Sequence, residues 1–230
     1  MKKKIILFIT LIILVGVISL VCIKLNSKDE KQVKDSIKFK EEYEKINDTV
    51  KPKVSLEDDN PFVYVSDKKI VDTLKNGTGL IYFGFSNCPW CRNAVNVLQY
   101  VNADKILYFD LKDKRDTYEV VNGVLTKTKD GTKEYYEVLE ILNNILDDYE
   151  IDDNSNTYKV GEKRIYVPLV VGVLNGKIVG YHLDTVELNE GQSPYDLLDE
   201  NQKSKLKLIY DEINTKVSSS ACDLNGNHGC

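Results

Sequence analysis

Two cysteines separated by two residues lie between an apolar segment and an amphipathic one, and this arrangement constrains the chain most strongly. The tetrapeptide Cys88-Pro89-Trp90-Cys91 follows the apolar run 79–85 and opens a segment whose apolar side chains recur at helical spacing. The pattern predicts a buried strand followed by a helix that carries both cysteines on its first turn. Two thiols at this spacing can close a small disulfide ring and reopen it, so the site is a candidate for thiol–disulfide exchange.

The predicted helix start favours the thiolate form of Cys88, because unpaired N–H groups and the helix dipole stabilise negative charge there. Such sites lower a cysteine pKa from about 8.5 to between about 3.5 and 7.5. Pro89 suits a first turn, where its missing N–H is not needed. Trp90 would add apolar surface beside the sulfur, and Arg92 would add positive potential. In the expected cycle Cys88 forms a mixed disulfide and Cys91 resolves it.

The same cysteine spacing also occurs as half of a zinc site. A structural zinc site needs a second pair of cysteines or histidines, and neither His182 nor His228 belongs to such a pair. The preceding strand and following helix favour redox chemistry, so we predict no metal and no other cofactor at the motif.

The first 23 residues predict a cytoplasmic tip and a transmembrane anchor. Lysines occupy positions 2–4, and the uncharged run 5–23 would span roughly 28 Å as a helix, close to the bilayer thickness. No small-residue cleavage site follows, which favours an uncleaved anchor in which Cys22 is a buried apolar residue. The leading lysines favour a cytoplasmic N-terminus. We therefore expect a single-pass protein of the cell membrane, in contact with the lipid bilayer through this helix, whose redox domain is extracytoplasmic.

Three further regions are expected after the anchor. Residues 24–60 are highly charged and predict a stalk with a short helix at about 29–47. Residues 61–217 show alternating strand and helix patterns and predict one domain. Residues 218–230 predict a flexible tail, since they are too polar and glycine-rich to pack. The stalk's apolar stripe would consist of Ile37, Phe39, Tyr43 and Ile46.

The domain pattern predicts an α/β sandwich, in which helices flank a central mixed sheet. An Asn-Gly pair at 175–176 indicates a hairpin, and residues 112–132 are compatible with a hairpin at 122–123 or a loop before a helix. The expected strands are 62–65, 80–85, 105–111, 164–174 and 177–182. The expected helices are 67–75, 89–101, 134–149 and 193–217.

A proline near the end of the domain adds a second constraint. Pro168 precedes a buried apolar run, and proline is disfavoured inside central strands, so it is expected at the strand start and is a candidate for a cis peptide bond. The segment Phe83-Gly84-Phe85-Ser86-Asn87-Cys88-Pro89-Trp90-Cys91-Arg92, followed by Val167-Pro168, resembles the thioredoxin superfamily. More narrowly, it resembles Gram-positive thioredoxin-like proteins related to bacteriocin transport accessory proteins. The resemblance covers about residues 60–217.

The resemblance implies a thioredoxin-like sandwich with a helical insertion at about 112–160. It implies that Cys88 is the nucleophile and Cys91 the resolving thiol. Pro168 would be a cis-proline facing the dithiol, with Val167 offering its backbone to an extended substrate and Trp90 lining the same surface. Thioredoxins commonly carry a buried acid on the strand before the motif as a proton acceptor for the second cysteine. Here the corresponding residue is Tyr82, which leaves the direction of electron flow open.

Two functions of different classes are compatible with these features. The first is a membrane-anchored thiol–disulfide oxidoreductase that acts on protein or peptide substrates and exchanges electrons with an unidentified membrane partner. The second is a non-catalytic accessory module that binds a secreted peptide or a transporter. The net charge of −5, without a basic stripe interleaved with aromatics, argues against nucleic acid.

The C-terminal tail carries two more cysteines, Cys222 and Cys230, and allows three interpretations. They can form a passive disulfide outside the cytoplasm. They can form a second dithiol that exchanges with the Cys88–Cys91 pair. Together with His228 they can bind a soft metal ion.

Overall fold

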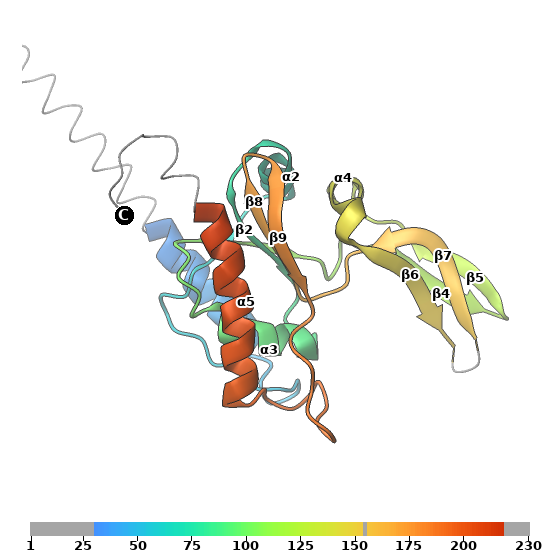
Figure 1. The fold of residues 1–230 in the computed structure, drawn as a ribbon. Helices are drawn as coiled ribbons and strands as arrows, with labels where there is room; N and C mark the ends of the chain where they lie inside the picture. The colour runs from blue at the N-terminus through green and yellow to red at the C-terminus, as the bar shows by residue number, and fades with distance from the viewer. Residues whose placement is uncertain (1–29, 154–155, 219–230) are drawn as a thin grey trace, which may run out of the picture.

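A central mixed sheet organises the molecule (Figure 1). The computed structural model describes residues 30–153 and 156–218. The five strands of this sheet are β1 (Phe62–Tyr64), β2 (Gly79–Gly84), β3 (Ile106–Asp110), β8 (Leu169–Leu174) and β9 (Lys177–Leu183). Their order is β1-β3-β2-β8-β9. Strands β1, β3 and β2 are parallel, β8 is antiparallel to β2, and β9 is antiparallel to β8. The expected α/β class with a central mixed sheet is confirmed.

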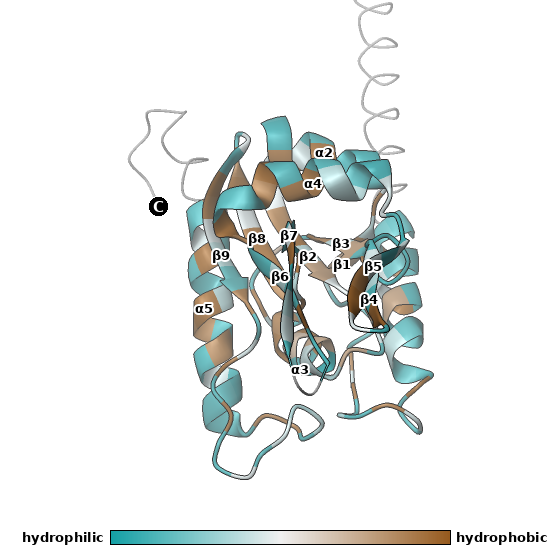
Figure 2. Ribbon diagram, turned by 90° about the vertical axis from the view of Figure 1, so that its right-hand side faces the viewer, coloured by the Kyte–Doolittle hydropathy of each residue, from teal (hydrophilic) through white to brown (hydrophobic). Residues whose placement is uncertain are grey.

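Helices cover both faces of the sheet and give the molecule two hydrophobic cores. Residues 30–44, which are helical, pack on one face with α3 (Pro89–Leu98) and α5 (Glu200–Ser218). The opposite face is covered by α2 (Asp67–Asn76) and α4 (Lys133–Leu142). In Figure 2 the central strands are largely brown, whereas the helices alternate between brown and teal, as expected for elements with one buried face.

Strand β2 lies at the centre of this arrangement and contributes side chains to both cores. Leu80 and Tyr82 belong to the first core, and Ile81 and Phe83 to the second. This alternation follows from the two-residue period of a strand, and a strand buried on both faces is apolar throughout. Strand β2 ends at Gly84, and α3 begins shortly after this C-terminal end of the strand.

The insertion between β3 and β8 differs from the expected one. It contains two hairpins, β4 (Thr117–Val121) with β5 (Val124–Lys129) and β6 (Asp147–Asp152) with β7 (Thr157–Arg164), which lie to one side of the sheet in Figure 1. The first turn is the Asn122-Gly123 alternative, with φ values of 52° and 76°.

The expected helix at 134–149 was wrong in its second half. Helix α4 ends at Leu142, a short 3-10 turn follows at Asn143–Ile145, and β6 then pairs with β7. Asparagines 143 and 144 compete for backbone hydrogen bonds and favour this termination. Residues 147–152 gain a partner strand, and this tertiary pairing overrides their helical pattern.

The described part of the expected stalk packs against the sheet. Phe39 and Tyr43 are fully buried, and the Phe39 ring stacks on Phe62 at 4.0 Å. Their four-residue spacing places both on one face of the helix, while the charged residues occupy the other. The expectation of a solvated stalk is therefore wrong for residues 30–60.

The last helix begins at Glu200 and not at 193. Asp199 accepts a hydrogen bond from the Gln202 amide at 2.8 Å, and the Gln202 side chain accepts one from the Asp199 amide at 2.9 Å. This reciprocal capping fixes the helix start. The expected anchor at 1–23 and the tail from 219 lie outside the described residues, as do Cys22, Cys222, His228 and Cys230. Within residues 30–153 and 156–218, no helix is long and apolar enough to cross a membrane.

Candidate dithiol site

Cys88 is the N-cap residue of α3, immediately after the turn that leaves β2. Its backbone is extended, with φ −84° and ψ 122°, and Pro89 occupies the first helical turn as expected. The Cys88 amide bonds to the Phe85 carbonyl at 3.3 Å, which closes the turn. Both thiols therefore lie on the first turn of a helix that follows the buried central strand β2.

The two sulfurs have different surroundings. Cys88 Sγ accepts a hydrogen bond from the Cys91 amide at 3.3 Å and lies 3.8 Å from the Val167 carbonyl oxygen. Cys88 is 8% exposed and Cys91 is 0% exposed, and both are free thiols. Cys88 is therefore the thiol nearer the surface, as the sequence predicts.

The electrostatics favour a thiolate on Cys88. The Cys91 thiol donates a hydrogen bond to the Cys88 sulfur, and this contact is the largest cause that lowers the Cys88 pKa. The amides of Cys91 and Trp90 and the positive charge of Arg115 lower it further, while burial opposes them. A lowered pKa gives more thiolate near neutral pH, and the thiolate is the attacking species.

Cys91 has the opposite character. Burial raises its pKa well above the usual range, and its bond to Cys88 adds to the rise. The Phe85 backbone and the Tyr82 hydroxyl act in the other direction, because their hydrogen bonds stabilise the charged sulfur. Cys91 is thus a protonated thiol held directly behind a more acidic one.

Val167 and Pro168 lie beside the dithiol. The Val167–Pro168 peptide bond is cis, and Pro168 directly precedes β8, which pairs antiparallel with β2. This pairing places Val167 next to the C-terminal end of β2, where its carbonyl oxygen lies 3.8 Å from Cys88 Sγ. Trp90 is half-buried on the helix between the two cysteines. The structure therefore brings these expected site residues together.

Arg92 does not contribute the expected charge to the site. It is completely buried, and its guanidinium donates to the carbonyls of Pro52 at 2.6 Å, Tyr43 at 3.0 Å and Ser86 at 3.0 Å. A further bond reaches the Asn47 side chain. These bonds tie residues 43–52 and the turn at Ser86 to α3, so the function of Arg92 is to hold that segment against the helix.

Arg115 supplies positive charge instead, a role that was not predicted from the sequence. Its guanidinium lies over the Phe85 ring at 4.9 Å, and its charge lowers the pKa of Cys88. Arg115 follows β3 in the segment 112–132, whose structure the sequence left open. Only the pairing of β2 with β3 brings the two segments together, so no local pattern could have identified it.

Metal binding has no support in the described part of the chain. No group of three or more histidine, cysteine or acidic side chains there could hold a metal ion. The His182 Nε2 atom lies 2.6 Å from the Thr185 carbonyl oxygen, and its ring packs edge-on against Tyr210. His182 is therefore a structural residue of the β9–α5 connection.

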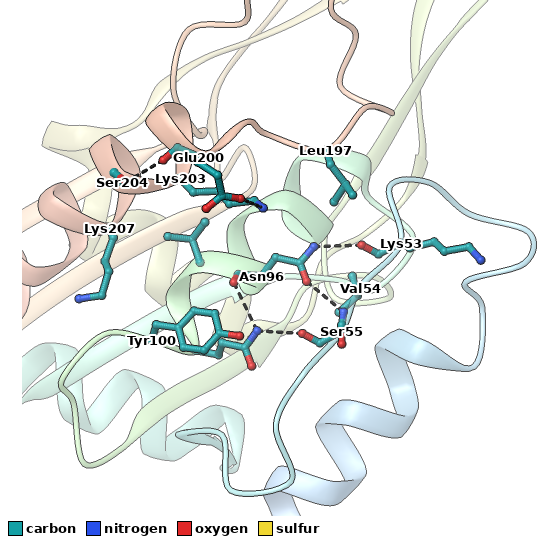
Figure 3. Close-up of a pocket in the computed structure, with 12 residues that line it drawn as sticks. Lys53, Val54, Ser55, Asn96, Tyr100, Leu197, Glu200, Lys203, Ser204 and Lys207 are labelled. Atoms are coloured by element: carbon teal, nitrogen blue, oxygen red, sulfur yellow. Dashed lines mark hydrogen bonds and ion pairs between the residues drawn. The ribbon is translucent and has the colours of Figure 1, made fainter.

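A cavity of about 590 Å³ lies apart from the dithiol, between residues 53–55, the second half of α3 and the start of α5 (Figure 3). Asn96 donates to the Lys53 carbonyl at 3.0 Å and accepts from the Ser55 amide at 3.0 Å. Gln99 donates to the Ser55 carbonyl at 2.8 Å. These amide side chains fix the chain at 53–55 to α3, and none of the dithiol residues lines the cavity.

Comparisons with known proteins found no matching family model, no matching curated protein and no matching solved structure.

Proposed function

We propose that this protein is a thiol–disulfide oxidoreductase that exchanges disulfides with protein or peptide substrates through Cys88 and Cys91. The observation that carries the proposal is the placement of the two thiols: Cys88 caps α3 and accepts a hydrogen bond from the Cys91 amide at 3.3 Å, whereas Cys91 is fully buried one turn further along the helix. This combination supports a nucleophile that attacks first and a resolving thiol that attacks second.

The proposal includes a thioredoxin-like fold. Its support is the central strand β2, the dithiol on the first turn of the following helix, and a cis-proline at the start of the neighbouring strand β8. The two hairpins and α4 would then be an insertion into that fold.

The proposed reaction takes two steps. The Cys88 thiolate attacks a substrate disulfide, so that a Cys88–substrate disulfide forms and one substrate sulfur leaves as a thiolate. Cys91 then loses its proton and attacks Cys88 Sγ, which closes the Cys88–Cys91 disulfide and releases the second substrate thiolate. The two leaving thiolates take up two protons, so the substrate disulfide is reduced and the protein dithiol is oxidised. The reverse sequence oxidises a substrate dithiol.

The proposal also includes a membrane location, supported by the uncharged run 5–23 and the lysines before it. The dithiol would then act outside the cytoplasm, where disulfides persist, with an electron partner in the membrane. Protease treatment of intact cells that express the protein tests this location. Because the protease does not enter the cells, it is expected to cleave the domain from their surface. Complete protection of the domain in intact cells would contradict this part.

Insulin reduction tests the activity. The full chain in detergent, supplied with dithiothreitol, is expected to accelerate insulin precipitation, and Cys88→Ser is expected to reduce the rate to the uncatalysed value. Cys88→Ser leaves the helix N-cap with a side-chain acceptor, so it is a matched variant for folding. Acceleration that survives in Cys88→Ser would overturn the proposal. An inactive wild type that still binds a secreted peptide would favour the accessory module.

A further inference from the structure

The buried sulfur of Cys91 lies among phenol side chains, and the Tyr82 hydroxyl bonds it. Tyr82, on β2, is fully buried and hydrogen-bonds the Cys91 thiol. Tyr43, from the helix at 30–44, lies with its hydroxyl 3.0 Å from that of Tyr82. In the described part of the chain, the titratable groups that act on Cys91 from the surrounding elements include Cys88, Tyr43, Tyr82, Arg115 and Tyr210.

The Tyr82 hydroxyl occupies space that is free because residue 84 is a glycine. A β-carbon at Gly84 would lie 2.1 Å from the Tyr82 hydroxyl oxygen and 2.4 Å from the ring carbon that bears it. The ring therefore folds along its own strand over a position without a side chain. The Tyr82 ring also stacks on Tyr108 at 5.6 Å and lies edge-on to Phe62. Packing thus fixes the hydroxyl beside the sulfur.

We propose that Tyr82 is a catalytic residue whose hydroxyl donates a hydrogen bond to Cys91 as that sulfur becomes a thiolate. Tyr43 is then a positioning residue that orients the Tyr82 hydroxyl. The inference rests on the proposed function and assigns a group to its second step. A phenol donates a hydrogen bond to the thiolate and does not take its proton. The Cys91 proton is released toward solvent, and the departing substrate thiolate takes up one proton, so the step is balanced.

The arrangement has a direction that follows from hydrogen-bond chemistry. For Tyr82 to donate to sulfur, its oxygen is left free to accept, and the Tyr43 hydroxyl at 3.0 Å is the donor in place. A donor that itself accepts a hydrogen bond is strengthened as a donor. Burial raises the pKa of both phenols well above the usual range, so both stay protonated while Cys91 titrates.

A stopped-flow reaction with the small disulfide DTNB separates the two steps. The protein is the full chain in detergent, with Cys22, Cys222 and Cys230 replaced by serine so that only the dithiol reacts. The first coloured thiolate released reports attack by Cys88, and the second reports resolution by Cys91. Tyr82→Phe is expected to leave the first phase unchanged. It is expected to slow the second about three- to tenfold and to move its pH profile to higher pH, because the loss of thiolate is only partly offset by greater nucleophilicity.

Tyr108→Phe is the matched control, since it removes a buried phenol of the same cluster whose hydroxyl bonds Glu42 at 3.1 Å and not the sulfur. It is expected to leave both phases unchanged. Tyr82→Phe alone leaves the Tyr43 hydroxyl without its partner and could therefore impair folding. The double variant Tyr43→Phe/Tyr82→Phe removes both hydroxyls and avoids this problem, and it is expected to show the same slow second phase.

A second phase in Tyr82→Phe and in the double variant with wild-type rate and pH profile would overturn the assignment. An equal slowing in Tyr108→Phe would also overturn it, because the effect would then come from packing. Absence of both phases in the wild-type dithiol would instead refute the proposed function, so the two failures are distinguishable.

Discussion

Cys88 and Cys91 are separated by one helical turn, yet their thiol pKa values are displaced in opposite directions. The causes are local. Cys88 is an N-cap that receives amide and thiol hydrogen bonds, whereas Cys91 is enclosed by the core. Since the Cys91 thiol is itself the main donor to Cys88, the resolving cysteine also activates the nucleophile.

This coupling predicts different effects for two substitutions of Cys91. Cys91→Ala removes the donor and is expected to raise the Cys88 pKa, whereas Cys91→Ser keeps an O–H donor and is expected to raise it less. The pH dependence of Cys88 alkylation by iodoacetamide measures both, since only the thiolate reacts. The midpoint is expected at a higher pH in the alanine variant. Equal midpoints in the two variants would contradict this origin of the shift.

The exchange of roles between two arginines gives a second prediction. Arg115→Met removes a positive charge that lowers the Cys88 pKa, so alkylation at pH 6 is expected to slow by about two- to threefold. Arg115→Lys keeps the charge and is the matched control. If both variants alkylate at the wild-type rate, Arg115 has no electrostatic role at the sulfur.

Part of this site was predictable from sequence and part was not. The cysteines, Pro89, Val167 and Pro168 belong to local patterns, and the structure brings them together at one sheet edge. Arg92 was assigned a role from its distance along the chain, but its guanidinium is engaged by the carbonyls of Tyr43 and Pro52, which are distant in sequence. Arg115 depends on strand pairing, which no local pattern encodes.

The helix at 30–44 is part of the folded core, although its composition is that of a solvated segment. Phe39→Ala is expected to lower the free energy of unfolding by about 3–5 kcal/mol, because it opens a cavity beside Phe62 and Tyr108. Ile37→Ala, at a position that is 40% exposed on the same helix, is expected to cost less than about 1 kcal/mol. Urea unfolding of both variants provides the measurement, and equal small losses would restore the stalk interpretation.

Arg92 connects this helix and the following loop to α3. Arg92→Met is expected to destabilise the protein by roughly 3 kcal/mol, since buried carbonyls of Tyr43 and Pro52 lose their donors. The alkylation profile of Cys88 is expected to stay unchanged, because Arg92 is not among the principal causes of the Cys88 pKa shift. A shifted profile in a folded Arg92→Met variant would show that the arginine acts on the sulfur after all.

The elements show where sequence periodicity suffices. Strand β2 and helices α2 and α3 have strong local signals, and their existence was predicted correctly. The end of α4 and the start of α5 depend on pairing of β6 with β7 and on the capping contacts of Asp199 and Gln202, which helical periodicity does not reveal. The burial of Phe39 and Tyr43 depends on a surface provided by the sheet.

Ionisation of Cys88 contributes to the free energy of unfolding of the whole molecule and makes it depend on pH. Because the folded pKa of Cys88 is lowered, the unfolded chain binds more protons at pH values between the folded and the unfolded pKa of this thiol. Stability of the reduced protein is therefore expected to rise with pH through that window, with a slope of at most about 1.4 kcal/mol per pH unit, and to lose this contribution as pH falls through the folded pKa. Urea unfolding of the reduced wild type and of Cys88→Ser at several pH values tests this. Identical slopes would contradict it.

The central claim is that Cys88 attacks a substrate disulfide and Cys91 resolves the product. The most direct test is mass spectrometry of the Cys91→Ser full chain after incubation with native, disulfide-bonded insulin, with Cys22, Cys222 and Cys230 replaced by serine. A stable disulfide-linked adduct of insulin on Cys88 is expected. In the matched Cys88→Ser protein no adduct is expected on Cys91, because that thiol is buried and protonated. No adduct on Cys88, or equal adducts on either cysteine, would refute this order of attack.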